Sequence, residues 1–305
     1  NDGDLDLFTG DRDDEDTIRY FENTGTATAP VFDTSPEPDP FGLYSTDAYS
    51  TPTFVDIDND GDLDAFIGKE NGEVNFFKNV GTAEDPDFEL QSNATACAPT
   101  FILPLETIDT GMFSAPAFAD IDGDGDLDAL VGGTGEYNND MVFLYENTGT
   151  PEAPAFTKRD GKSSSTWGFD AGYNSTPILA DIDGDGDLDA FIGNEDGYVL
   201  FSENTGTATS PNFQPISMDD NNNPLNGVDV GRYSHPAFVD IDGDGDLDAF
   251  IGNAEGQILF LKNFGSATAP DFVQQYGDDN PFDDMDSGDY TAPTFVDLDG
   301  DGDRS

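Results

Sequence analysis

The segment Pro52-Thr-Phe-Val-Asp-Ile-Asp-Asn-Asp-Gly-Asp-Leu-Asp-Ala-Phe-Ile-Gly68 decides the fold, because the chain repeats it. It returns as Pro116-Ala-Phe-Ala-Asp-Ile-Asp-Gly-Asp-Gly-Asp-Leu-Asp-Ala-Leu-Val-Gly132, then from Pro177 to Gly193 and from Pro236 to Gly252. The first Asp of the acidic loop stands at positions 56, 120, 181, 240 and 297, which gives spacings of 64, 61, 59 and 57 residues. An Asn-x-Gly turn follows each loop in phase, at Asn23, Asn79, Asn147, Asn204 and Asn263. Such self-similarity indicates a repeat architecture with one structural unit per repeat.

Each repeat predicts four short strands. In the clearest repeat these are residues 53–57, 63–67 and 73–78, with a fourth strand that begins near Phe88. The second strand carries large apolar residues on both faces, such as Phe66 beside Ile67, and a strand of this kind is buried on both sides. Radially packed four-stranded blades bury their strands in this way. The sequence therefore predicts an all-β fold, a β-propeller with blades of about 60 residues.

The positions of the strands predict the number of blades. First strands start near residues 53, 117, 178, 237 and 294, and second strands near residues 5, 63, 127, 188 and 247. The chain begins inside one acidic loop and ends inside another, so we expect one domain, residues 1–305, of five blades closed by pairing of the N- and C-terminal strands. The repeat units are 1–55, 56–119, 120–180, 181–239 and 240–296, and residues 297–305 start a further or ring-closing repeat.

The loop pattern Asp-x-Asp-x-Asp-Gly-x-x-Asp suits calcium, which takes roughly six to eight oxygen ligands. Positions one, three and five supply converging carboxylates, Gly at position six permits the sharp turn, and position nine completes the set. Position seven is expected to offer its backbone carbonyl and to point its side chain outward. Apolar residues at positions two and eight, such as Ile57 and Leu63, anchor the loop. The candidate ligands of the four intact loops are Asp56, Asp58, Asp60, Asp62 and Asp64; Asp120, Asp122, Asp124, Asp126 and Asp128; Asp181, Asp183, Asp185, Asp187 and Asp189; and Asp240, Asp242, Asp244, Asp246 and Asp248.

A fifth loop is divided between the chain ends. Its candidate ligands are Asp297, Asp299, Asp301 and Asp303 from one end and Asp2 and Asp6 from the other. None of these loops fits an EF-hand, because position twelve, which needs a Glu, is Ile67, Val131, Ile192 or Ile251 in the intact loops. Magnesium is a weaker candidate, since its strict octahedral geometry suits fewer protein ligands.

Composition narrows the classes of partner. The chain has 65 acidic and 10 basic residues and a formal net charge of −55. A compact body with this charge is destabilised by self-repulsion unless cations neutralise part of it, and nucleic acid and anionic membranes would be repelled. One Cys and one His cannot build a disulfide framework or a zinc site. We do not expect an enzyme, because the single His235 occupies a repeated strand position held elsewhere by Thr51, Ala115, Thr176 or Ala292.

The repeated Asp-Ile-Asp-Gly-Asp-Gly-Asp-Leu-Asp with its Phe-Ile-Gly, and the trailing Asn-Thr-Gly-Thr-Ala, resemble the FG-GAP/VCBS repeats that also form the calcium-binding propeller of integrin α subunits. The resemblance covers essentially the whole chain. It implies a β-propeller with calcium loops, a secreted or cell-surface location, and adhesive, recognition or scaffolding roles. Integrins have seven blades, so their ligand binding is not carried over.

Three functional hypotheses follow. The first is an extracellular structural or adhesive module rigidified by calcium, either able to assemble head to tail into a filament or part of a longer tandem array. The second is a glycan-binding propeller, for which the aromatic candidates in the variable segments are Tyr44, Tyr137, Trp167, Tyr173 and Tyr233. The third and weakest is an enzyme. Asn93-Ala-Thr and Asn174-Ser-Thr also fit the N-glycosylation pattern.

Overall fold

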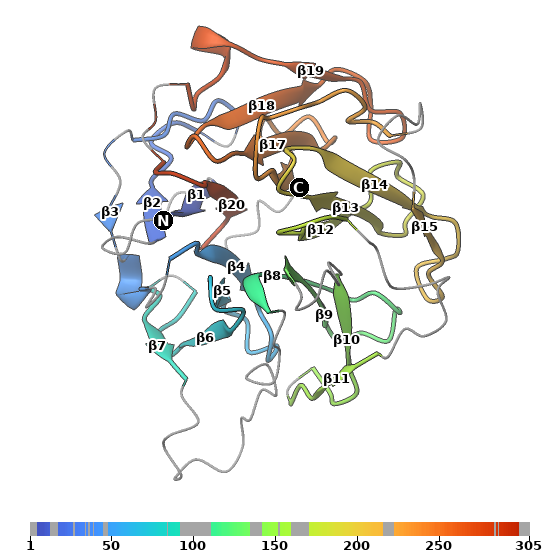
Figure 1. The fold of residues 1–305 in the computed structure, drawn as a ribbon. Helices are drawn as coiled ribbons and strands as arrows, with labels where there is room; N and C mark the ends of the chain where they lie inside the picture. Colours follow the sequence, from blue (N-terminus) through green and yellow to red (C-terminus); the bar gives the residue numbers. More distant parts are fainter. Residues whose placement is uncertain are drawn as a thin grey trace.

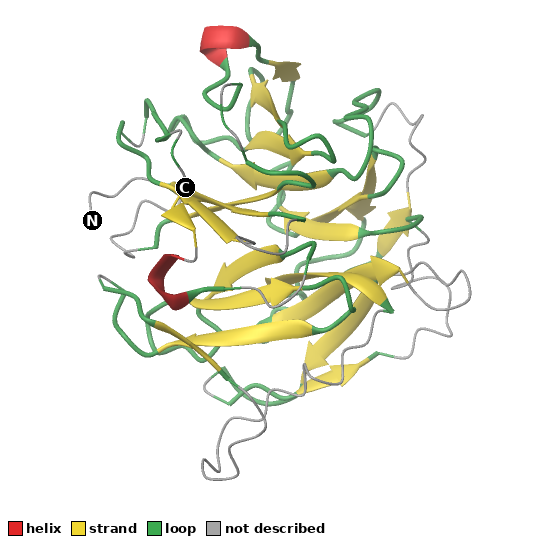
Figure 2. Ribbon diagram, turned by 60° about the vertical axis from the view of Figure 1, so that its left-hand side comes forward, coloured by secondary structure: helices red, strands yellow, loops and turns green. Residues whose placement is uncertain are grey.

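The computed structural model describes most of the chain, namely residues 5–12, 18–26, 28–33, 35, 37–38, 40–44, 48–83, 85–91, 111–134, 142–151, 153–159, 171–215, 223–283, 285 and 287–298. Within these ranges twenty strands form five four-stranded antiparallel sheets. Figure 1 shows the sheets arranged around a common centre, as the blades of a propeller. The view in Figure 2 is dominated by strands and loops. The helical segments of the described ranges are two short 3₁₀ turns, η1 (Pro40–Gly42) and η3 (Gly277–Asp279), and no helix there is long and apolar enough to cross a membrane.

The strands of each blade run from the centre outward. The closing blade consists of β20 (Ala292–Val296), β1 (Asp6–Gly10), β2 (Ile18–Phe21) and β3 (Glu37–Pro38). Blade two has β4 (Thr51–Val55), β5 (Asp64–Gly68), β6 (Val74–Asn79) and β7 (Phe88–Leu90), and blade three has β8 (Met112–Ala119), β9 (Asp128–Thr134), β10 (Phe143–Asn147) and β11 (Phe156–Lys158). Blade four has β12 (Thr176–Ala180), β13 (Asp189–Gly193), β14 (Val199–Asn204) and β15 (Phe213–Pro215), and blade five has β16 (His235–Val239), β17 (Asp248–Gly252), β18 (Ile258–Asn263) and β19 (Phe272–Gln274).

The ring closes where the sequence predicts. Strand β20 pairs with β1 in a continuous antiparallel register from Asp6 opposite Val296 to Gly10 opposite Ala292, and Figure 1 shows the red strand lying beside the blue one. The prediction of five four-stranded blades is confirmed. The first predicted strand, 53–57, is wrong by two residues, because the ladder ends at Val55 and Ile57 leaves it to insert between blades. The predicted strands 63–67 and 73–78 are each displaced by one residue at both ends.

The hydrophobic core lies between the blades. All five residues of β5 are buried, and its two faces serve different interfaces. Phe66 packs in one cluster with Ala129 and Val131 of blade three, whereas Ile67 packs in another with Phe8 of the closing blade. This arrangement explains why the second strand of each repeat is apolar on both faces.

The repeated glycine at the end of the second strand is a packing residue. A Cβ built on Gly193 would lie 2.0 Å from the backbone carbonyl oxygen of Ser234 in the next blade, and one on Gly68 would lie 2.0 Å from that of Ser114. No side chain fits such a gap, so glycine lets neighbouring blades approach closely. The sequence marks this position as repeated without giving the reason.

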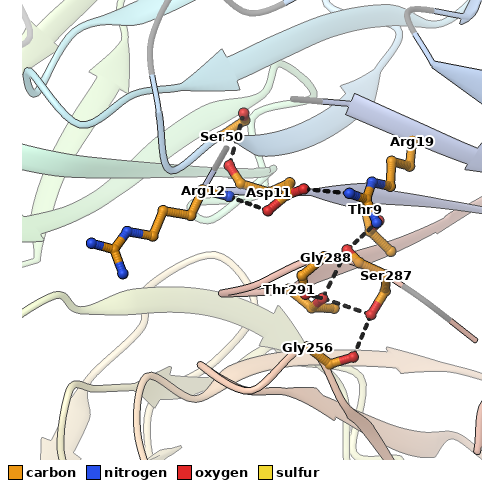
Figure 3. Close-up of polar contacts among 9 residues, drawn as sticks. All are labelled: Thr9, Asp11, Arg12, Arg19, Ser50, Gly256, Ser287, Gly288 and Thr291. Atoms are coloured by element: carbon orange, nitrogen blue, oxygen red, sulfur yellow. Dashed lines mark hydrogen bonds and ion pairs between the residues drawn. The ribbon is translucent and has the colours of Figure 1, made fainter. Parts of the chain in front are cut away.

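A buried carboxylate secures the closing blade (Figure 3). Asp11 directly follows β1 and is fully buried, with 0% of its surface exposed. Its Oδ2 accepts a hydrogen bond from Arg19 Nη2 at 2.7 Å, and its Oδ1 accepts the backbone N–H of Arg12. The backbone N–H of Ser50 donates to the Asp11 carbonyl at 3.1 Å and so ties blade two to this blade. Because a buried charge is costly without partners, these contacts stabilise the seam.

The two ends of the central channel differ. The inner strands β4, β8, β12, β16 and β20 line a cavity of about 220 Å³. Five residues at the starts of these strands have left-handed φ angles between 54° and 60°, and they are Tyr49, Phe113, Asn174, Tyr233 and Tyr290. Their rings meet edge to face, for example Tyr49 with Tyr290 at 4.8 Å between centroids, and the Arg12 guanidinium lies 5.0 Å from the Tyr290 centroid. The acidic loops follow the opposite ends of the same strands.

Candidate metal centre

Each of the four intact acidic loops joins the inner strand of its blade to the second strand. In every one, the carboxylates at positions one, three and five bring one oxygen each to within 4.8 Å of the others. The backbone orients the first carboxylate: Asp56 accepts the N–H groups of Asp60 and Gly61, both at 3.1 Å. The loops connect strands, and the residues at position twelve, such as Ile67, are buried in the sheet. The prediction that these loops are not EF-hands is therefore confirmed for the described residues.

Position nine links the acidic loop to the Asn-x-Gly turn. Asp64 is the first residue of β5, and its Oδ1 accepts the backbone N–H of Asn79 at 2.8 Å. The Asn79 side chain in turn accepts the N–H groups of Gly81 and Asp87. The same bond to the Asn backbone recurs at 2.7 Å from Asp128, Asp189 and Asp248. The two landmarks that repeat in phase along the sequence are thus hydrogen-bonded to each other, which sequence analysis did not predict.

Several carboxylate oxygens of these loops are buried without a hydrogen-bond partner. They belong to positions three, seven and nine and are Asp58 Oδ1, Asp62 Oδ1, Asp64 Oδ2, Asp122 Oδ1, Asp126 Oδ1, Asp187 Oδ1, Asp189 Oδ2, Asp242 Oδ1, Asp246 Oδ1 and Asp248 Oδ2. A buried acceptor left unsatisfied costs about 1–3 kcal/mol, and more when it is charged. The donor set consists of hard oxygens only, which is the set that calcium prefers. The residues present therefore fit a calcium ion.

The expected orientation of position seven is wrong. The side chains of Asp62, Asp126, Asp187 and Asp246 were expected to point outward, yet each has its Oδ1 fully buried. Asp126 and Asp187 are only 7% and 8% exposed. The physical reason lies in the turn, where the position-seven N–H donates to the position-five carboxylate, as Asp187 does to Asp185 Oδ1 at 3.0 Å. The carboxylate, rather than the backbone carbonyl alone, is available as a ligand.

Burial raises the pKa values of these carboxyls in the metal-free chain. At position nine, burial is the largest cause, opposed by the bond from the Asn backbone, and it raises the pKa of Asp64 to about 8. The same causes raise the pKa values of Asp128, Asp189 and Asp248 to about 7. At position seven, burial and then the neighbouring position-five charge raise the pKa of Asp187 to about 6. Because metal ligands must be deprotonated, protons compete with a cation for these groups.

The fifth loop is described only in part. Asp297 follows Val296 of β20 and is buried, and Asp6 stands opposite Val296 in the ladder. Asp6 Oδ1 accepts the N–H of Asn23 at 2.8 Å, which is the position-nine bond of the intact loops. Its Oδ2 accepts the Tyr20 hydroxyl at 2.8 Å, in contrast to the unpartnered oxygens of Asp64 and its equivalents. Asp2, Asp299, Asp301 and Asp303 lie outside the described residues.

Two lysines that the sequence analysis missed reach the loops. Lys78 Nζ contacts the carboxylates of Asp58 and Asp60, and Lys262 Nζ contacts Asp242. Each lysine immediately precedes the Asn of the Asn-x-Gly turn. The available signal was a basic residue at a fixed place in the repeat, in a chain with only 10 of them.

The remaining candidates have other surroundings. His235 lines the channel beside Thr51 and Thr176, as its repeat position predicts, and burial lowers its pKa to about 4. Asn174 is only 8% exposed, and its side chain accepts a hydrogen bond from Thr134 at 2.8 Å, so the folded chain does not present it for glycosylation.

The aromatic candidates for a glycan site are divided. Tyr173 and Tyr233 flank Glu195, whose backbone bonds to both, and Tyr44 packs edge-on against Phe77. Tyr137, Trp167 and Asn93 lie outside the described residues.

The fold and loops define a class, a five-bladed propeller whose inner loops gather aspartates. A family model described as FG-GAP-like repeat matches residues 1–67, 56–131, 120–192 and 181–251. These matches cover most of the 305 residues, and the chain belongs to the FG-GAP-like repeat family.

Comparisons with individual proteins give distant likenesses. No curated protein matches the chain. One similar structure is a lectin of Agrocybe aegerita that recognises non-reducing terminal N-acetylglucosamine, with 21% identity, a TM-score of 0.40, and coverage of 90% of this chain and 62% of the lectin. Another is a Tc holotoxin pore of Photorhabdus luminescens, with 18% identity, a TM-score of 0.37, and coverage of 86% of this chain and 11% of the toxin chain.

Proposed function

We propose that this protein is a calcium-binding propeller in which the four intact loops each hold one Ca²⁺ ion. The observation that carries the proposal is the set of buried carboxylate oxygens without hydrogen-bond partners at positions three, seven and nine. The clustered carboxylates at positions one, three and five support it independently. Repeats of this family are generally associated with calcium, which agrees with the donor set.

The loop residues have distinct roles in this proposal. Positions one, three and five supply carboxylate oxygens, and position seven adds another. Position nine gives one oxygen to the site and uses the other to hold the Asn-x-Gly turn, as Asp189 does with Asn204. Calcium, when bound, supplies the positive charge that these buried oxygens lack. Each site would therefore couple the loop to the outer part of its own blade.

Thermal unfolding in calcium and in EGTA tests the proposal. Binding to the folded state alone contributes about 2.7 kcal/mol per site at a free calcium concentration of 100 Kd. We expect EGTA to lower Tm strongly and calcium to restore it, while magnesium restores less. An unchanged Tm, together with no heat of binding on calcium titration, would refute the proposal.

We further propose an extracellular or cell-surface structural or adhesive role without catalysis. The acidic composition and the family support this location. Antibody labelling of intact cells tests it, and labelling only after permeabilisation would contradict it. Head-to-tail assembly would need β1 and β20, which pair within one chain. Light scattering that gives a monomer in calcium and in EGTA supports the closed ring, whereas calcium-dependent large species would support a filament.

Glycan binding is the second candidate. Tyr173 is 46% exposed and lies with Tyr233 beside Glu195 near the aromatic end of the channel. An exposed tyrosine at a loop position suits contact with a sugar face. A glycan array tests this candidate: binding that Tyr173→Ala abolishes would favour it, and a negative array would count against it.

A further inference from the structure

The four intact loops fall into two chemical classes according to the residue before the Asn of the Asn-x-Gly turn. This residue is Lys78 in blade two and Lys262 in blade five, but Glu146 in blade three and Glu203 in blade four. The backbone bond from the following Asn to position nine places the residue at the edge of the loop in every blade. The sign of the charge at this edge therefore differs between two pairs of loops.

Contacts show that the lysines act on the loops directly. Lys78 Nζ pairs with Asp58 and lies 3.1 Å from Asp60 Oδ2, and Lys262 Nζ pairs with Asp242. The partners are at positions three and five, which are proposed calcium ligands. Both lysine side chains are 27% exposed, so solvent screens these pairs only in part.

The loop backbone differs between the same two pairs. In the lysine loops, Oδ1 of position one accepts the N–H of position five, as Asp60 donates to Asp56 and Asp244 to Asp240, both at 3.1 Å. In the glutamate loops the same oxygen accepts the N–H of position four, from Gly123 at 2.7 Å and Gly184 at 2.8 Å.

The lysine loops thus have both a different charge and a different turn. Position four does not explain the difference, because it is Asn59 in one lysine loop and Gly243 in the other.

We infer that Lys78 and Lys262 are built-in counter-cations that make loops 56–64 and 240–248 weaker calcium sites than loops 120–128 and 181–189. The inference rests on the proposed calcium function. Calcium affinity in oxygen-ligand loops depends on the net charge of the ligand set. A lysine ammonium on two ligands lowers that net charge and must leave before both oxygens can coordinate. In the metal-free protein the same ammonium offsets the repulsion among the carboxylates, so the lysine loops need calcium less.

Calcium titration of chelator-stripped full-length protein by calorimetry tests the inference. We expect two classes of site that differ at least tenfold in Kd, with two sites in the weak class. The double variant Lys78→Met, Lys262→Met should move both weak sites into the tight class. Glu203→Lys should move one tight site into the weak class. Lys69→Met is the matched control, since Lys69 lies beyond the far end of β5 and pairs with Glu73, and it should change neither class.

Thermal unfolding in EGTA gives a readout that does not depend on bound metal. The double lysine variant should have a lower Tm than the parent, and Glu203→Lys a higher one, opposite to their effects on calcium affinity. Four equivalent sites that the lysine substitutions leave unchanged would overturn the inference while leaving calcium binding intact. A complete lack of calcium binding would overturn the proposed function as well. Should the double variant fail to fold, Glu203→Lys alone decides between these outcomes.

Discussion

Replacing Asp189 with Asn should raise the stability of the metal-free protein and reduce its response to calcium. Asp189 is 2% exposed; its Oδ1 accepts the Asn204 N–H at 2.7 Å, and its Oδ2 is buried without a partner. Burial raises its pKa from 3.8 to about 7, so ionisation favours the unfolded chain. At pH 7 this preference amounts to about 4 kcal/mol at most, at ~1.4 kcal/mol per pH unit. The amide keeps an acceptor for Asn204 and removes this cost.

The calcium response should change by the contribution of one site. At a free calcium concentration of 100 Kd that contribution is about 2.7 kcal/mol, and the Asp189→Asn substitution would replace one oxygen of the site by an amide nitrogen. Urea unfolding at pH 7, in calcium and in EGTA, measures both quantities. Asp271→Asn, an exposed position in the β18–β19 turn, is the control. A loss of stability in EGTA, or a calcium response equal to that of the parent, would refute the reasoning.

Three further outcomes are expected. Gly193→Ala should cost about 3 kcal/mol in urea unfolding, because its Cβ would force a shift of about 1 Å from the Ser234 carbonyl; Gly227→Ala, which meets nothing within 4 Å, should cost about 1 kcal/mol from its positive φ alone, and equal costs would contradict the packing argument. Metal-free stability should fall as pH rises from about 4 to 7, because the raised pKa values at position nine mean that the folded state binds the extra protons; a Tm in EGTA that rises over this range would contradict that sign. Asp11→Ala should cost about 3 kcal/mol by leaving Arg19 without its buried partner, and a loss below about 1 kcal/mol would show that the closing seam does not need the pair.

The sequence predicts the parts of this structure that repeat. Five copies of the acidic loop and of the Asn-x-Gly turn determine the number of blades, and the interrupted loops at the two ends predict the pairing of β1 with β20. The carboxylates at positions one, three and five come together as expected, because the skipped spacing and the glycine constrain a short turn. In these cases the information is local and is present several times.

Features that depend on neighbouring segments could not be predicted. Gly193 is repeated in the sequence, but its reason lies in a carbonyl about 40 residues away in the next blade. Asn174 matches a glycosylation pattern, yet a hydrogen bond from Thr134 buries it. Position seven turns inward because the turn directs its N–H, and hence its side chain, toward position five. The contacts of Lys78 depend on where the strand after the loop returns.

The pairing of β1 with β20 has a consequence for biosynthesis. The two strands are separated by 290 residues, from Asp6 to Val296. At about 5–20 residues per second, β1 waits on the order of 15–60 s after its own synthesis before its inner partner exists. During that time the inner edge of the first blade offers unpaired backbone groups to any other strand. The large negative charge then acts as a safeguard, because mutual repulsion keeps nascent chains apart until the last strand arrives.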